Sequence, residues 1–283
     1  MDQSGSPLAQ LLDVMADGSG RCIGPAAGTD EKRTFGGVLL GQGLAASARS
    51  ADGLPCHSFH ALFVAGGVVA EPAQISVSCL RDGRSFKSRS IAIAQGDRLI
   101  LSALASFHNG DAGPEHQVAM PDVGLPHTLE DQRELRWRNA AARGRPVRRY
   151  ASEEMLDARS VDLPINTTHG MEGQRYVWFR SRWPLSDDPV LHQAVIAFAS
   201  DAGMVHVGTL PHNSLGTGTR LDFASLDHTI RFHCAARADG WLLHVQHSPV
   251  AVAGRGLARG TIFDAAGTLV ATVTQEFLLR YAR

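Results

Sequence analysis

The stretch from residue 188 to residue 203 reads DPVLHQAVIAFASDAG and predicts a helix on which the fold is built. Asp187 and Asp188 are candidate caps, Pro189 suits the first turn, and Gly203 marks the end. The apolar side chains at helical spacing define one buried face, formed by Leu191, Ala194, Val195 and Phe198.

Asp201 extends the same face, because it lies three residues beyond Phe198 and seven beyond Ala194. A carboxylate buried there needs hydrogen-bond partners, and its desolvation raises its pKa. The alternative is an aspartate that points to solvent past the end of the core. The helix by itself does not decide between these two interpretations.

The second half of the chain predicts one strand before this helix and a run of strands after it. Alternating apolar patterns and turn residues place these strands at 174–183, 221–232, 240–246, 256–264 and 268–279. The first half has a helix-like segment at 35–46 followed by strands at 57–64, 74–81, 84–94 and 98–107. A helix followed by consecutive antiparallel strands is an α+β pattern.

The two halves also repeat at the level of residues. A shift of 171 positions aligns His57-Ser58 with His228-Thr229, Gly83-Arg84 with Gly254-Arg255, Ile91 with Ile262, and Gly96 with Gly267. The chain is therefore interpreted as a duplicated helix-plus-sheet unit. We expect one repeat over residues 1–118, a linker over 119–150 that holds a short exposed helix, and a second repeat over 151–283.

The segment at 35–46, FGGVLLGQGLAA, is unusually rich in glycine for a helix. Because glycine is a poor helix former, its expected use here is close packing of another backbone against the helix. The run lacks the G-x-G-x-x-G spacing and the preceding apolar strand of a dinucleotide loop.

Composition narrows the class of protein. The 283 residues include 44% hydrophobic and 19% charged residues, with a net charge of −1, which is typical of a soluble globular protein without a basic nucleic-acid surface. Cys22, Cys56, Cys79 and Cys234 form no CxxC pair and are expected to be reduced thiols. No apolar run approaching membrane-spanning length and no signal peptide is recognised, so a cytoplasmic location is expected.

Comparison of the repeats singles out three polar residues. Gln275 interrupts the apolar face of the last strand, while the first-repeat face has no polar member. Asp201 falls over about Ala45, and Ser225 falls near Leu54. Buried polar groups of this kind usually satisfy one another, so the trio is either a structural network or a site for polar chemistry in an apolar pocket.

Seven segments together resemble the acyl-CoA thioesterase II family. They are FGGVLLGQGLAA, HSFHALFV, LRDGRSF and ASFHNGDAGPEHQVAMP in the first half, and ASDAGMV, ASLDHTIRFH and VTQEF in the second. The resemblance covers roughly residues 20 to 280. It implies a double hotdog, in which two tandem antiparallel sheets each wrap one helix, and a catalytic trio that falls on Asp201, Ser225 and Gln275.

The resemblance further implies hydrolysis of a fatty acyl-CoA to a free acid and CoA without a covalent enzyme intermediate. Asp201, Ser225 and Gln275 would activate the attacking water, with no cofactor and no metal, and the substrate would be the partner. Ser225 departs from the family's common threonine, which keeps the hydroxyl but loosens its rotamer. Arg84, Arg89 and Arg255 are candidates for the CoA phosphates by charge alone.

Two other functions stay open on the same fold. A hydratase or dehydratase would pair a histidine with a helix carboxylate, but His192, nine residues before Asp201, lies on a different side of the helix. A non-catalytic acyl-thioester binder would keep the pocket without needing the trio. The strand histidines His57, His60, His228 and His233 are interpreted as hydrogen-bonded structural residues. Association into a homodimer or homotetramer is an expectation by analogy with other hotdog proteins.

Overall fold

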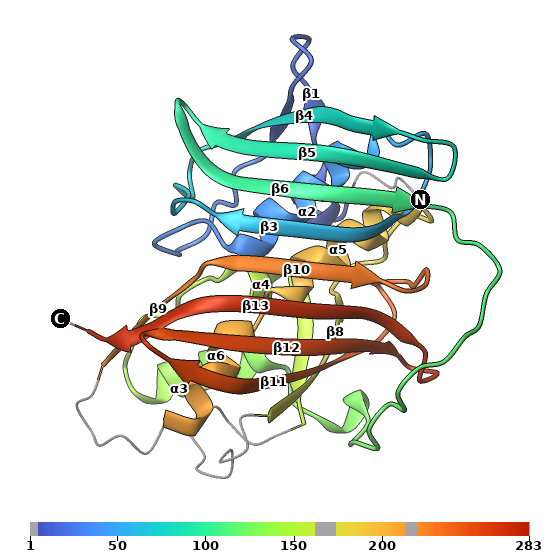
Figure 1. Cartoon of the computed structure of the whole chain (residues 1–283). Helices are drawn as coiled ribbons and strands as arrows, with labels where there is room; N and C mark the ends of the chain where they lie inside the picture. Colours follow the sequence, from blue (N-terminus) through green and yellow to red (C-terminus); the bar gives the residue numbers. More distant parts are fainter. Residues whose placement is uncertain (1–4, 162–173, 213–219, 283) are drawn as a thin grey trace.

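The computed structural model describes residues 5–161, 174–212 and 220–282 and has two helix-and-sheet units side by side (Figure 1). Thirteen strands form one antiparallel sheet with the order β1-β2-β4-β5-β6-β3-β10-β13-β12-β11-β8-β7, and β9 pairs with β13. The strands are β1 (Met15–Ala16), β2 (Cys22–Gly24), β3 (Cys56–Phe63), β4 (Ala73–Asp82), β5 (Phe86–Gln95), β6 (Arg98–His108), β7 (Leu156–Ser160), β8 (Gln174–Ser181), β9 (Leu221–Ser225), β10 (Asp227–Phe232), β11 (Leu242–Val252), β12 (Arg255–Asp264) and β13 (Leu269–Tyr281).

The helices lie mainly on the inner face of this curved sheet (Figure 1). They are α1 (Pro7–Leu12), α2 (Gly36–Ala48), α3 (Gln132–Ala142), α4 (Ala151–Met155), α5 (Pro189–Ser200) and α6 (Met204–Thr209), with 3₁₀ turns at Pro126–Thr128 and Leu210–His212. Helix α2 packs against the first-half strands, and α6 against β11, β12 and β13. The α+β double-hotdog architecture predicted from the sequence is confirmed.

The duplication is visible in the strand positions. Strands β3, β5 and β6 of the first half have counterparts β10, β12 and β13 about 171 residues later. The halves join where β3 pairs with β10, with Phe59 opposite Ile230. This junction makes one continuous sheet from two repeats.

Helix α5 begins as its sequence predicts, because the Asp188 side chain accepts a hydrogen bond from the Val190 amide and Pro189 occupies the first turn. It ends earlier than predicted, at Ser200. Asp201 is its C-cap, Gly203 adopts a left-handed φ of 84°, and α6 follows at Met204. Helix α6 was not predicted from the sequence, and the break before it places Asp201 at a helix end.

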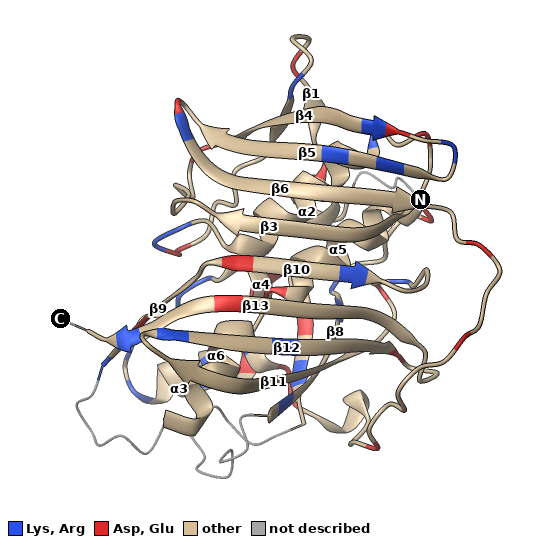
Figure 2. Ribbon diagram, in the orientation of Figure 1, with Lys and Arg blue, Asp and Glu red and all other residues tan. Residues whose placement is uncertain are grey.

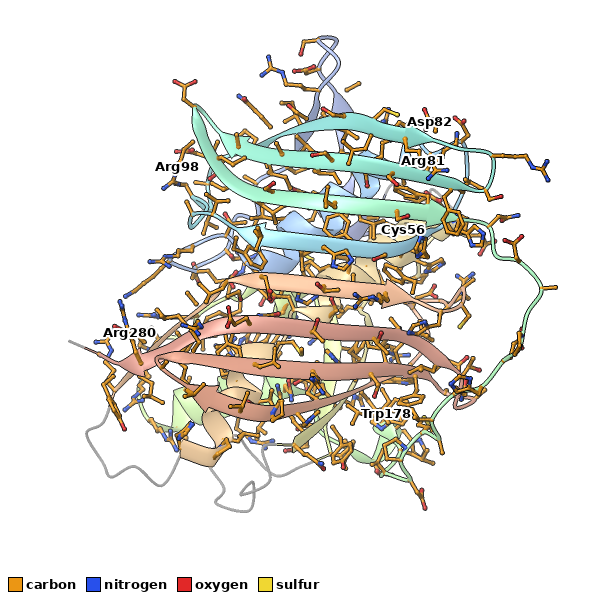
Figure 3. The ribbon with its side chains drawn as sticks, in the orientation of Figure 1. Cys56, Arg81, Asp82, Arg98, Trp178 and Arg280 are labelled. Carbon is orange, nitrogen blue, oxygen red and sulfur yellow. The ribbon has the colours of Figure 1, made fainter. Side chains whose placement is uncertain are left out.

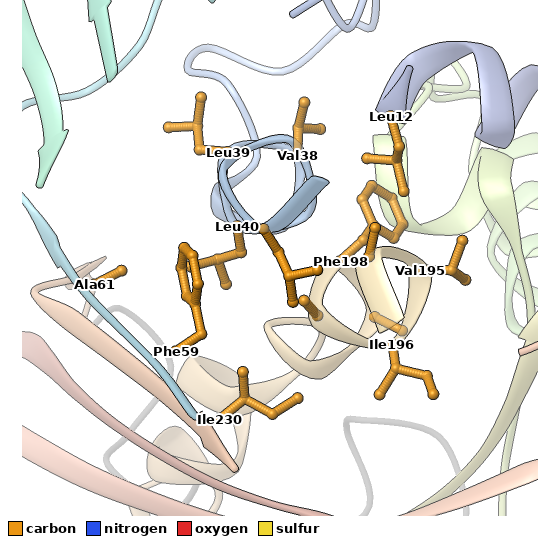
Figure 4. Close-up of a cluster of buried hydrophobic side chains, with 14 of the residues drawn as sticks. Leu12, Val38, Leu39, Leu40, Phe59, Ala61, Val195, Ile196, Phe198 and Ile230 are labelled. Atoms are coloured by element: carbon orange, nitrogen blue, oxygen red, sulfur yellow. The ribbon is translucent and has the colours of Figure 1, made fainter. Parts of the chain in front are cut away.

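Helices α2 and α5 run antiparallel in close contact at the centre of the protein. A Cβ on Gly37 would lie 2.2 Å from the Phe198 carbonyl oxygen, and one on Gly41 would lie 2.9 Å from that of Ala194. These glycines therefore let the two backbones approach closely, as the sequence predicted. Around them Leu40, Phe59 and Phe198 belong to one buried apolar cluster (Figure 4).

Several predicted elements differ in detail. The segment 221–232 is two strands, because β9 ends at Ser225 and β10 begins at Asp227. β11 runs on to Val252, six residues past the predicted end. Strands β1, β2 and β7 and helix α4 were not predicted; all are short, and short elements carry little periodic signal.

The segment between the halves contains the expected exposed helix, α3, none of whose residues is buried. The four cysteines are free thiols, as predicted. Charged residues of both signs are interspersed along the strands, whereas α2 has none (Figure 2).

One run, Pro189–His212, is long and apolar enough to cross a membrane by length and composition, which the sequence analysis did not recognise. It comprises α5, the turn at Asp201, α6 and a 3₁₀ turn. Most of α5 is buried, and it packs mainly against α2 and α1, which is the environment of a core helix in a globular protein.

Candidate functional site

A cavity of about 750 Å³ lies where the start of α2 meets the end of α5. The loop before α2, the ends of β3 and β9, strands β7, β8 and β11, and helices α3, α4 and α6 also contribute to its lining. Apolar side chains make up much of the lining, among them Leu39, Phe63, Leu156, Val177 and Phe179. Such a cavity suits an apolar ligand that carries a polar group.

Asp201 lines this cavity at the junction of the two helices. Its side chain is 7% exposed, and its Oδ2 accepts a hydrogen bond of 3.0 Å from the Gly37 amide at the start of α2. Because this bond crosses between the repeats, the position of the carboxylate depends on the packing of α2 against α5. The interpretation of Asp201 as solvent-exposed is wrong.

Gln275 and Ser225 lie beside Asp201, as the comparison of the repeats predicted. Gln275 on β13 is fully buried, and its Nε2 donates to Ser225 Oγ at 2.8 Å. Its amide also interacts with the Asp201 carboxyl and acts to lower the pKa of Asp201. Asp201 and Ser225 line the cavity, whereas Gln275 is behind them and links the two.

Burial raises the pKa of Asp201 to about 6, and hydrogen bonds from Gln275 and Gly37 oppose this rise. A carboxyl with such a pKa is ionised at neutral pH and is a stronger base than an ordinary aspartate. The arrangement therefore provides a base, an adjacent hydroxyl and an amide that holds both.

The network extends to His228, which sequence reasoning had grouped with the structural histidines. Its Nδ1 is 2.6 Å from Gln275 Oε1, and its Nε2 is 2.8 Å from Ser200 Oγ. The other three members of that group are also hydrogen-bonded: His57 to Ser106, His60 to Ser58 and Thr229, and His233 to Thr272. His228 differs from them in contacting a member of the candidate trio.

Sequence reasoning also missed the arginines of the cavity, which are Arg33, Arg136 and Arg175. The three candidates chosen by charge do not line it. Arg89 is buried and bonded to Asp82 and to the Arg81 carbonyl. Arg81 and Asp82 lie at the end of β4 (Figure 3). Arg255 pairs with Glu276. The charge of an arginine does not reveal from the sequence whether its side chain will line the cavity of the folded protein.

His192 is not part of the site. It is buried on α5, and its Nδ1 accepts a hydrogen bond from the Ala238 amide at 3.1 Å. It is not among the residues that line the cavity with Asp201. This geometry excludes His192 as the histidine partner of Asp201 in a hotdog hydratase. Within the described ranges, no group of three or more His, Cys, Asp or Glu is placed to hold a metal ion.

The chain matches two domain models of one protein family. The family model described as the acyl-CoA thioesterase N-terminal domain matches residues 25–108, and the acyl-CoA thioesterase C-terminal domain matches residues 120–279. Acyl-CoA thioesterase 2 of Haemophilus influenzae is 32% identical over 255 residues, which cover 89% of each chain.

The solved structures similar to this chain also include an acyl-CoA thioesterase. An acyl-CoA thioesterase II from Mycobacterium marinum superposes with a TM-score of 0.79 and 35% identity, covering 97% of this chain and 98% of its own. A protein of unknown function with a hotdog fold from Alicyclobacillus acidocaldarius has a TM-score of 0.77 over 98% of both chains at 18% identity, which supports the fold alone.

Proposed function

The chain belongs to the acyl-CoA thioesterase family and is a thioester hydrolase, and from this premise we propose that it hydrolyses fatty acyl-CoA with water activated by Asp201, Ser225 and Gln275. The observation that supports this site is the buried carboxylate of Asp201, which lines an apolar cavity with Ser225 and is hydrogen-bonded to Gln275. The cavity's apolar lining suits a hydrocarbon chain.

The hydrogen bonds among Gln275, Ser225 and Asp201 determine where the donor protons of the proposed site point. Gln275 donates to Ser225 Oγ, so the Ser225 proton is free to point at a water in the cavity. That water accepts from Ser225 and donates to Asp201, which leaves a lone pair on its oxygen for attack on the thioester carbonyl. Asp201 takes the water's proton as the carbon–oxygen bond forms.

Collapse of the tetrahedral intermediate breaks the carbon–sulfur bond. The departing CoA thiolate takes the proton held by Asp201, which returns the carboxylate to its starting state. The products are a free acid and CoA. The reaction consumes one water and, as proposed, needs no cofactor and no metal. The cytoplasmic location and association into a homodimer or homotetramer stay predictions.

The test of this function is release of free thiol from straight-chain acyl-CoAs of increasing length. We expect turnover that depends on chain length, because a longer chain fills more of the apolar cavity up to its limit. Tight binding of one acyl-CoA without thiol release would instead support an acyl-thioester binder. Addition of water to an enoyl-CoA without thiol release would support a hydratase.

The pH dependence gives a second prediction. Because only ionised Asp201 accepts a proton, kcat/KM is expected to rise as the pH increases through about 6 and then to level off. The measurement is a pH profile of kcat/KM between pH 4.5 and 8.5 with one acyl-CoA. An acid limb at the ordinary aspartate pKa of about 4 would show that the titrating base is not the buried carboxylate.

A further inference from the structure

His228 is a fully buried side chain that connects the candidate trio to α5. On β10 it is next in register to the pair Thr229–Thr274, so it faces Gln275 of β13 across the ladder. One ring nitrogen contacts the Gln275 amide oxygen and the other contacts Ser200, the residue before Asp201.

The amide of Gln275 has two orientations, and they have opposite consequences for Asp201. With Nε2 toward Asp201 and Ser225, the amide donates to both, and Oε1 must accept from a His228 Nδ1–H. With the amide reversed, its oxygen faces the Asp201 carboxylate and Nε2 needs an unprotonated Nδ1. The tautomer of His228 and the orientation of Gln275 are therefore linked.

Ser200 is compatible with either tautomer. Its hydroxyl lies 2.8 Å from both His228 Nε2 and the Ala197 carbonyl oxygen, and its single proton can serve one of them. It donates to Nε2 when Nδ1 carries the proton, and it donates to Ala197 when Nε2 does. The ionised carboxylate of Asp201 selects the Nδ1–H tautomer of His228. It does so because it favours a Gln275 amide that turns its N–H groups toward Asp201, and that orientation leaves the Gln275 oxygen to accept from His228.

We propose that His228, in its Nδ1–H tautomer, is a positioning residue that holds the Gln275 amide with its N–H groups toward Asp201 and Ser225. The inference rests on the proposed hydrolytic site and adds a residue to it. His228 does not line the cavity and acts through Gln275.

The surroundings keep His228 neutral, as this role requires. Burial lowers the pKa of His228 to about 4, and the hydrogen bond to Gln275 and the charge of Asp227 oppose this lowering. His244 on β11 faces it, with its own pKa lowered to about 3 by burial. Glu31 interacts with Asp201 from the loop before α2, and Arg175 on β8 interacts with His244.

The direct test is the tautomer of His228 in the wild-type protein. Long-range ¹⁵N–¹H spectra of histidine-labelled protein at pH 8 distinguish Nδ1–H from Nε2–H, and through-bond correlation of the ring to the assigned backbone of His228 identifies its signal. We expect the Nδ1–H tautomer. An Nε2–H tautomer would overturn the inference, while thiol release by the same sample would leave the hydrolytic function intact.

The kinetic test compares two substitutions. His228→Leu removes the donor, so Gln275 is free to reverse; kcat is expected to fall by about 10- to 100-fold with KM little changed. The acid limb of kcat/KM should move to higher pH, because an amide oxygen beside Asp201 disfavours its ionised form. His228→Asn offers an amide N–H near the Nδ1 position. In this variant the acid limb of the kcat/KM profile is expected to return toward its wild-type pH.

His57→Asn is the matched control. His57 occupies the corresponding position of the first repeat and is likewise hydrogen-bonded to a serine, Ser106, but does not line the cavity. We expect an unchanged pH profile. A His228→Leu variant that folds and keeps the wild-type profile would contradict the inference; if neither His228 variant folds, the wild-type tautomer still decides it.

Discussion

Replacing Asp201 by asparagine is expected to lower kcat by about 10²- to 10⁴-fold, the contribution typical of a positioned general base. Asparagine keeps an oxygen for the Gly37 amide, so the local geometry should be retained. What is lost is the ability to take a proton from water. The measurement is free-thiol release by the variant and the wild type with the same acyl-CoA, over a range of substrate concentrations.

The same variant is expected to be more stable than the wild type above pH 6. Asp201 has a folded pKa of about 6, above its ordinary 3.8, so ionisation of this buried group opposes folding as the pH rises. Asparagine does not ionise and avoids this cost, which corresponds to up to roughly 3 kcal/mol for a shift of about two units. Below about pH 3.8, Asp201 is protonated in both the folded and the unfolded wild type, so the stability difference between the variant and the wild type should vanish. Urea unfolding of both proteins at pH 4 and pH 8 measures the difference.

Asp188→Asn is the control at the opposite end of α5. Asn and Asp are equally good N-caps, so both stability and turnover should stay close to those of the wild type. Wild-type turnover in Asp201→Asn would remove Asp201 from the catalytic site while leaving the thioesterase family assignment in place.

Gly37→Ala is expected to destabilise the protein and to reduce its activity together. The added Cβ would lie 2.2 Å from the Phe198 carbonyl oxygen, which is backbone and can move only if the helices separate. Overpacking of this kind costs about 1–3 kcal/mol. Separation also draws the Gly37 amide away from Asp201, so kcat should fall. Urea unfolding and thiol release measure the two effects.

Gly43→Ala controls for the change of residue type in the same helix. There the nearest atom is Phe59 Cζ at 3.2 Å, the far end of a side chain, and alanine favours the helix by about 0.5–1 kcal/mol. Its net effect on the free energy of unfolding should stay within about 1 kcal/mol. If Gly37→Ala and Gly43→Ala lose stability and activity equally, the close α2–α5 contact at Gly37 is not the cause of the loss.

Much of the fold could be predicted from the sequence because it is repetitive and periodic. The strands displaced by 171 residues carry alternation on both copies, and the cap of α5 follows from Asp188 and Pro189. Gly203 was correctly read as lying near the end of α5, but the short helix α6 beyond it was not predicted, because a continuing apolar pattern does not separate two helices.

The site was only partly predictable, for a physical reason. Asp201, Ser225 and Gln275 were recognisable because each interrupts an apolar pattern within its own element. The Gly37 amide lies 164 residues from Asp201, and this contact arises only from the antiparallel packing of two helices. The same holds for the three cavity arginines and for the bonds of His228, which depend on tertiary contacts.

The bond from Gly37 to Asp201 has a consequence for how such a chain could arise by fusion of two copies. A symmetric pair of identical units would hold two equivalent reaction centres, one at each end of the paired helices. In this chain the second repeat carries the carboxylate, whereas the first has alanine near the equivalent position and supplies the amide that donates to it. The proposed reaction centre therefore takes its carboxylate from one repeat and a donor to that carboxylate from the other.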